Sequence, residues 1–156
     1  MAGTNAKTAK SSKKARMSAA RLAAVQAVYQ MMANEQKAES VIEEYRVRRF
    51  GKPVDGQAMV MPEQELFADI VNGVEARRAE IEAILVKPEQ KIPAEPLLRS
   101  ILLCGTWELL TQENTDTPLI IAEYLNVTHA FFGQGESRMI NGVLDRVKGE
   151  VRGKAS

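Results

Sequence analysis

The apolar positions of this chain repeat with the period of an α-helix along most of its length. Between residues 97 and 110 nearly every side chain is apolar, and the run is interrupted only by Arg99, Ser100, Thr106 and Glu108. Leucine dominates the segment and proline is absent from it, as is typical of a helix. A helix that is apolar on all sides has to be surrounded by other elements. The pattern therefore predicts a central helix around which the rest of the chain packs.

Five further segments carry one apolar face at helical spacing. We expect the first to begin after Ser18 as its N-cap and to bury Leu22, Val25, Tyr29 and Met32. Prolines, glycines and capping residues bound the others. The five predicted helices cover residues 18–33, 39–48, 62–86, 117–132 and 137–151.

These segments predict an all-α protein, a compact bundle of about six to seven helices in two small halves. Pro88, Pro93 and Pro96 fall within nine residues and are the best boundary between the halves, which cover about 17–87 and 95–151. A length of 156 residues suits one domain, here 17–151. Residues 152–156 form a basic tail. No segment has the ~20 consecutive apolar residues that span a membrane.

The charges are distributed unevenly along the chain. Residues 1–34 carry six Lys and Arg side chains and no acid, whereas the remainder carries 15 basic and 20 acidic side chains. Residues 1–16 also lack large apolar side chains after Met1, so we expect a disordered basic arm. Such an arm could bind a polyanionic partner, or it could be a solvated tail that keeps the protein soluble; the charge pattern favours neither. An acid-free amphipathic start also resembles an organellar transit peptide.

Few residues are available for catalysis or metal binding. The chain has one cysteine, Cys104, inside the central helix, and one histidine, His129. A disulfide framework is excluded, a reducing compartment is favoured, and one histidine and one cysteine leave little for a zinc site or a catalytic triad. Glu43 and Glu44 adjoin on an exposed helix rather than forming a catalytic pair. We expect no metal, no cofactor and no enzymatic activity.

Three motifs, in this order, resemble one known family. They are ARLAAVQAVYQ at residues 20–30, WELL at residues 107–110 and INGVLD at residues 140–145. Each motif alone is weak, but their order and spacing over residues 16–148 are specific. The chain therefore resembles the NusB family of bacterial transcription antitermination factors.

The resemblance implies a non-enzymatic, all-helical, cytoplasmic RNA-binding protein. Family members bind boxA-type leader RNA together with NusE, a protein of the small ribosomal subunit. They act with the RNA polymerase elongation complex and other Nus factors to promote read-through in ribosomal RNA operons. A homodimer is also compatible with the family. The alternative function is a helical protein–protein interaction module that does not bind RNA.

The resemblance also indicates where RNA contacts lie. Single-stranded RNA needs cations for its phosphates and flat or polar groups for its bases. The family places the cations at the start of the first helix and further contacts between the last two helices. Four residues differ from those usual in the family, so the family's contacts cannot be copied directly onto this chain. They are Leu98, Leu103, Ala122 and Met139, the last of which stands where an aromatic residue is common. Phe131 and Met139 are open to two interpretations, RNA contact or core packing. The candidate RNA-binding residues are Lys13, Lys14, Arg16, Arg21, Gln134, Glu136, Ser137, Arg138 and Met139.

Overall fold

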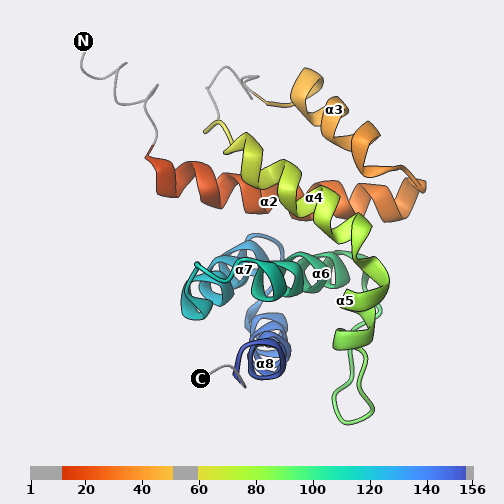
Figure 1. Ribbon diagram of the computed structural model, residues 1–156, viewed down its shortest axis with the longest axis vertical. Helices are drawn as coiled ribbons and strands as arrows, with labels where there is room; N and C mark the ends of the chain where they lie inside the picture. Colours follow the sequence, from red (N-terminus) through yellow and green to blue (C-terminus); the bar gives the residue numbers. More distant parts are fainter. Residues whose placement is uncertain (1–11, 51–59, 154–156) are drawn as a thin grey trace.

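The described part of the chain folds almost entirely into helices. The computed structural model describes residues 12–50 and 60–153, and within them the chain forms seven α-helices (Figure 1). The only β-type pairing in these ranges is one isolated bridge, between Lys87 and Gln90. The all-α prediction is confirmed. The helices are α2 (Lys13–Asn34), α3 (Ala38–Arg48), α4 (Gln64–Ala76), α5 (Arg78–Leu85), α6 (Pro96–Thr111), α7 (Thr117–Phe131) and α8 (Gln134–Val151).

The predicted central helix is α6. Its first turn is capped by the side chain of Glu95, which accepts a hydrogen bond from the Leu98 amide at 2.8 Å. Leu98 and every residue from 100 to 109 are buried. α6 contacts α2, α4, α5, α7 and α8, so its apolar sides all find partners. The prediction of a central helix is confirmed.

The other helices are arranged in two layers around α6. In Figure 1, α2, α3 and α4 lie above, α6, α7 and α8 lie below, and α5 stands at one side. α2 joins the layers, because it packs on α3 and α4 and also on α6 and α7. None of the helices in the described ranges is long and apolar enough to cross a membrane.

The first helix starts earlier than predicted. Its N-cap is Ser12 rather than Ser18, and the Ser12 hydroxyl accepts a hydrogen bond from the Ala15 amide at 3.0 Å. Lys13, Lys14 and Arg16 therefore belong to α2, not to the disordered arm that was predicted to extend to residue 16. The rest of that arm, residues 1–11, lies outside the described residues.

The buried face of α2 also differs from the prediction. Its core is made mainly of alanines, namely Ala20, Ala23, Ala24 and Ala27, together with Val25 and Val28. Small side chains let α4 and α6 pack close to α2. The positions of the large apolar residues therefore did not predict which face of α2 is buried. Tyr29, expected inside, is 41% exposed, and Leu22 and Met32 are only partly buried.

The predicted long helix over 62–86 is two helices. Arg77 separates α4 from α5 with a ψ of 24°, and α5 turns onto α6 and α8. The apolar pattern carried no sign of the break. Val74 and Ile81 are both buried and lie seven residues apart, about two helical turns, so the apolar stripe stays in register across it.

The last helices begin at residues that differ slightly from those expected. Asp116, not Thr117, is the N-cap of α7. α8 begins at Gln134 rather than Ser137, and the Glu136 carboxylate accepts a hydrogen bond from the Gly133 amide at 3.1 Å. This bond completes the first turn of α8 and explains its earlier start.

Arg152, assigned to the basic tail, instead closes the end of α6. Its guanidinium donates to the carbonyl oxygens of Leu109 at 2.9 Å and Thr115 at 2.7 Å, and also to those of Glu108 and Gln112. A cation suits carbonyl oxygens at and just after a helix C-terminus. Residues 154–156 lie outside the described residues.

Candidate nucleic-acid interface

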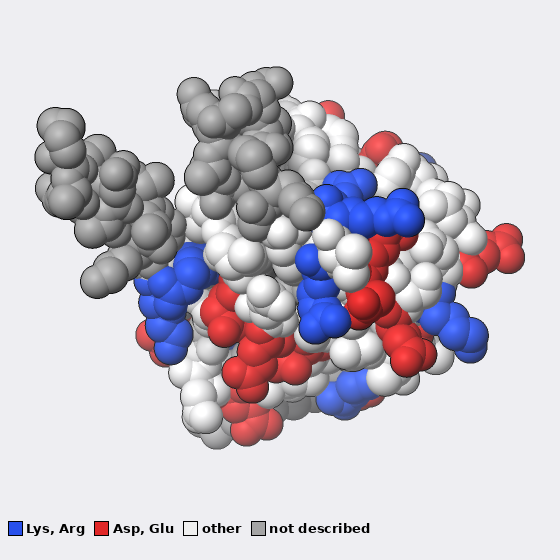
Figure 2. All heavy atoms as spheres, turned by 90° about the horizontal axis from the view of Figure 1, so that it is seen from above, with Lys and Arg blue, Asp and Glu red and all other residues white. Residues whose placement is uncertain are grey.

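The basic start of α2 is exposed. Lys13 and Lys14 occupy its first turn, and no hydrogen bond or ion pair within the described residues holds either ammonium group. Cations at a helix N-terminus oppose the helix dipole, so these lysines do not serve the stability of α2. Figure 2 shows basic side chains at the end of the molecule where α2 begins, with acidic side chains next to them. Arg16 is half-buried, and its carbonyl oxygen accepts a hydrogen bond from the Glu63 amide at 2.9 Å.

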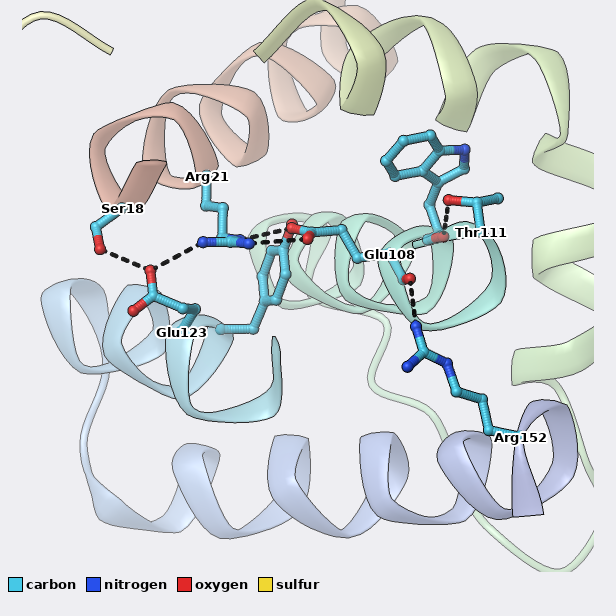
Figure 3. A network of polar contacts seen from close by, with 8 residues as sticks. Ser18, Arg21, Glu108, Thr111, Glu123 and Arg152 are labelled. Carbon is cyan, nitrogen blue, oxygen red and sulfur yellow. Dashed lines mark hydrogen bonds and ion pairs between the residues drawn. The ribbon is translucent and has the colours of Figure 1, made fainter. Parts of the chain in front are cut away.

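Arg21, the fourth predicted cation, is buried in an ion-pair network. It is 4% exposed, and two of its nitrogens bind the carboxylate of Glu108, Nε to Oε2 at 2.7 Å and Nη2 to Oε1 at 3.0 Å. Its Nη1 lies 3.3 Å from Oε1 of Glu123 (Figure 3). Burial disfavours the charge of Arg21. The hydrogen bond and the charge of Glu108 outweigh this, so the pKa of Arg21 is raised above its ordinary value.

Two hydroxyl groups complete the network. Ser18 donates to Oε1 of Glu123 at 2.6 Å, and Tyr124 donates to Oε2 of Glu108 at 2.6 Å. Burial and the charge of Glu108 hold the pKa of Tyr124 well above its ordinary value, so the phenol stays protonated and acts as a donor. The network joins α2, α6 and α7 at one point.

This placement changes the role expected of Arg21. A guanidinium that meets an RNA phosphate has to reach solvent, whereas that of Arg21 is buried between two carboxylates. Withdrawing it would leave both carboxylates buried without a counter-ion. Arg21 therefore holds α2 against α6 and α7. Of the predicted phosphate contacts at the start of α2, Lys13, Lys14 and Arg16 remain.

A cleft opens between the start of α2 and the turn that joins α6 to α7. Its volume is about 560 Å³. One wall carries Lys13, Lys14 and Met17, and the other carries residues 114–116 and Leu119, with the Arg21–Glu123 pair at its base. The sequence offered no sign of this second wall, because Asn114 and Asp116 indicated only a turn.

The second group of predicted contacts lies at the start of α8. Gln134 and Arg138 are exposed. The other three have structural contacts: Glu136 closes the first turn, Ser137 is buried with its hydroxyl 3.3 Å from Nδ1 of His129, and Met139 packs against the core. Phe131, for which the sequence also left RNA contact and core packing open, is 41% exposed.

The two groups of predicted contacts are not brought together. α7 packs against both α2 and α8, while α2 and α8 do not contact each other within the described residues. An RNA strand that meets both groups has to pass along or around α7. No group of three His, Cys, Asp or Glu side chains in the described ranges is placed to hold a metal ion.

The described residues define a class of protein: a helical bundle whose first helix presents exposed lysines and is held against two other helices by a buried arginine. Comparison with known proteins supplies the family. The NusB family model matches residues 18–148, and the chain belongs to that family. The resemblance seen in the three sequence motifs is thereby confirmed.

Relatives in several bacteria match nearly the whole chain. The transcription antitermination protein NusB of Rhizobium rhizogenes is 36% identical over 88% of this chain and 88% of its own length. The protein of the same name from Agrobacterium fabrum is 36% identical over 88% of this chain and 86% of its own. That of Novosphingobium aromaticivorans is 37% identical over 86% of this chain and 93% of its own.

Proposed function

We propose that this protein is a non-enzymatic transcription antitermination factor that binds boxA-type leader RNA in the cytoplasm. In this proposal it acts with NusE and the RNA polymerase elongation complex to promote read-through in ribosomal RNA operons. The exposed pair Lys13 and Lys14 carries the proposal: both lysines lie in the first turn of α2, just upstream of the matched residues 18–148, and no side chain in the described ranges pairs with them. The relatives' name, transcription antitermination protein, supports the same role.

The proposed contacts divide by chemistry. Lys13, Lys14 and Arg16 neutralise phosphates, and these contacts position the strand without reading its sequence. Gln134 and Arg138 on α8 have exposed amide and guanidinium groups that suit base edges. Arg21 contributes indirectly, because it holds α2 against α6 and α7.

A cleft with two exposed aromatic side chains supports the proposed protein partner. Tyr29 and Phe131 are both 41% exposed, and with Leu97 they line a cleft of about 600 Å³ between α2, α3, α6 and α7. The rest of its lining is mostly polar and includes Glu44 and Arg49. Met32 and Pro96 line the adjoining hollow. Exposed aromatic groups of this kind mark protein interfaces. We propose NusE as the occupant; a homodimer through this face and an interaction module without RNA are the competing arrangements.

The first test of RNA binding is its salt dependence. Each phosphate contact on a single strand lowers the slope of log affinity against log salt by about 0.7, so three contacts give a slope near −2. We expect Lys13→Ala with Lys14→Ala to flatten the slope by about 1.4 and to weaken boxA and scrambled RNA alike. Filter-binding titrations measure both effects.

The matched control is Lys37→Ala with Lys91→Ala. Both lysines are exposed and lie outside the cleft. This double variant should leave the slope unchanged. An unaltered slope in the Lys13 and Lys14 variant would contradict the phosphate assignment. Failure of the unmodified protein to bind RNA with or without NusE would favour the interaction module.

The second test concerns the partner. If RNA, NusE and this protein form one unit, NusE raises the RNA affinity, and by linkage RNA raises the NusE affinity by the same factor. We expect Tyr29→Ala to reduce this coupling, while Val86→Ala, at an exposed valine elsewhere, should not. Isothermal titration in both orders measures the factor. An RNA affinity that is equal with and without NusE would remove the joint unit.

A further inference from the structure

The cleft between α2 and the turn from α6 to α7 has the properties of a preformed binding site. Its volume of about 560 Å³ is in the range of small-molecule pockets. Both walls are held in place from behind. On the α2 side, Arg21 and Ser18 bind Glu123, and on the turn side Arg152 donates to the Thr115 carbonyl oxygen at 2.7 Å. The Thr115 amide is also bonded to the Gln112 carbonyl oxygen at 3.0 Å.

The charges in the cleft are arranged by wall. Lys13 and Lys14 carry positive charge on the α2 wall, and Asp116 carries negative charge on the opposite wall. Asp116 is the N-cap residue of α7, yet its carboxylate accepts no hydrogen bond from the first turn of that helix. The carboxylate is exposed, and no hydrogen bond or ion pair from the described residues occupies it. Asn114, also exposed, adds a carboxamide to the same wall.

Apolar groups lie between the two charged walls. Leu119 is 44% exposed although it lies in the first turn of a largely buried helix, and Met17 is half-buried across from it on α2. A bare phosphate would suit the lysines but not the acid on the other wall. A ligand with a phosphate at one end, a flat apolar ring and an amino group at the other end satisfies all three features.

We propose that this cleft holds one unstacked nucleotide of single-stranded RNA whose base carries an exocyclic amino group, cytosine or adenine. Lys13 and Lys14 bind its phosphates, Met17 and Leu119 contact the base, and Asp116 accepts from the amino group, as carboxylates do from cytosine N4. Asn114 contacts the remaining polar edge. This inference rests on the proposed RNA-binding function and adds to it a base-reading position apart from α8.

The test compares oligocytidine with oligouridine of equal length, because the two bases differ only along one edge: cytosine has an amino group at position 4 and an acceptor at N3, whereas uracil has a carbonyl and an N–H donor there. Full-length protein should bind oligocytidine about five- to tenfold more tightly at fixed salt, the low end of the discrimination of one good base contact. Asp116→Ala should remove that preference. Circular dichroism and thermal melting of the variant check that it is folded.

Glu113→Ala is the matched control, since Glu113 is an exposed carboxylate in the same turn that does not line the cleft. It should keep the cytidine preference. If Asp116 were only a nearby negative charge, Asp116→Ala would strengthen binding to both oligomers equally. That result, or equal binding of both oligomers by the unmodified protein, overturns the inference. If boxA RNA is still bound, the proposed function survives; loss of all RNA binding, including boxA, overturns both.

Discussion

Replacing Arg21 with alanine lowers the free energy of unfolding by about 3–5 kcal/mol. The change leaves Glu108 and Glu123, both buried, without the guanidinium that pairs with them, and an uncompensated buried charge is among the costliest defects in a protein. Urea denaturation followed by circular dichroism measures the loss. Adding Glu108→Gln to the Arg21→Ala variant should recover part of it, because one of the two unneutralised carboxylates is then gone.

Arg46→Ala is the control for Arg21→Ala. Arg46 also forms an ion pair, with Glu43 at 2.8 Å, but both side chains are more than half exposed. Its removal should cost less than about 1 kcal/mol. An equally small loss for Arg21→Ala would contradict a structural role for Arg21. A second readout separates structure from RNA contact: at temperatures where the variant is folded, its salt slope for RNA should match that of the unmodified protein.

Replacing Trp107 with alanine lowers the free energy of unfolding by about 3–5 kcal/mol. It also changes the effect of a substitution at Gly73, which lies against the Trp107 ring. Trp107 is 7% exposed and its ring lies against the backbone of α4. A Cβ atom added at Gly73 would lie 2.0 Å from Trp107 Nε1 and 2.2 Å from Cε2, so the ring has no room to stay. The alanine figure follows from the cavity left by a buried aromatic side chain.

We expect the effect of Gly73→Ala on the free energy of unfolding to depend on whether Trp107 is present. Gly73→Ala alone should destabilise the protein by about 1–3 kcal/mol, because overpacking outweighs the better helix propensity of alanine. In the Trp107→Ala background the clash is absent, and Gly73→Ala should be neutral or stabilising by up to ~1 kcal/mol. A double-mutant cycle in urea measures both values.

Gly149→Ala is the matched control on α8. A Cβ atom there would meet nothing within 4 Å, so the substitution should stabilise the protein by about 0.5–1 kcal/mol in either background. Additive effects of Gly73→Ala and Trp107→Ala would contradict the packing described for α4 and α6.

The sequence by itself determined the helical class, the central helix and the family. All three follow from local information. The period of the apolar residues indicates the helical class, the apolar residues on all sides of α6 indicate the central helix, and three motifs in order indicate the family. Periodicity records which side of a helix is buried as long as large side chains form the core. It failed on α2, where alanines form the buried face, and across Arg77, where the apolar stripe continues in register through a break.

Only the tertiary structure decided which charged residues are accessible. The sequence presents Lys13, Lys14 and Arg21 as one cationic series, yet Arg21 meets Glu108, which lies 87 positions further along the chain. Glu108 was visible as a charge inside an apolar helix, but its partner was not, since no local pattern encodes a contact between distant segments. The cleft wall formed by Asn114, Asp116 and Leu119 faces the lysines for the same reason. Composition specifies how much charge a chain carries; long-range packing determines which of it meets solvent.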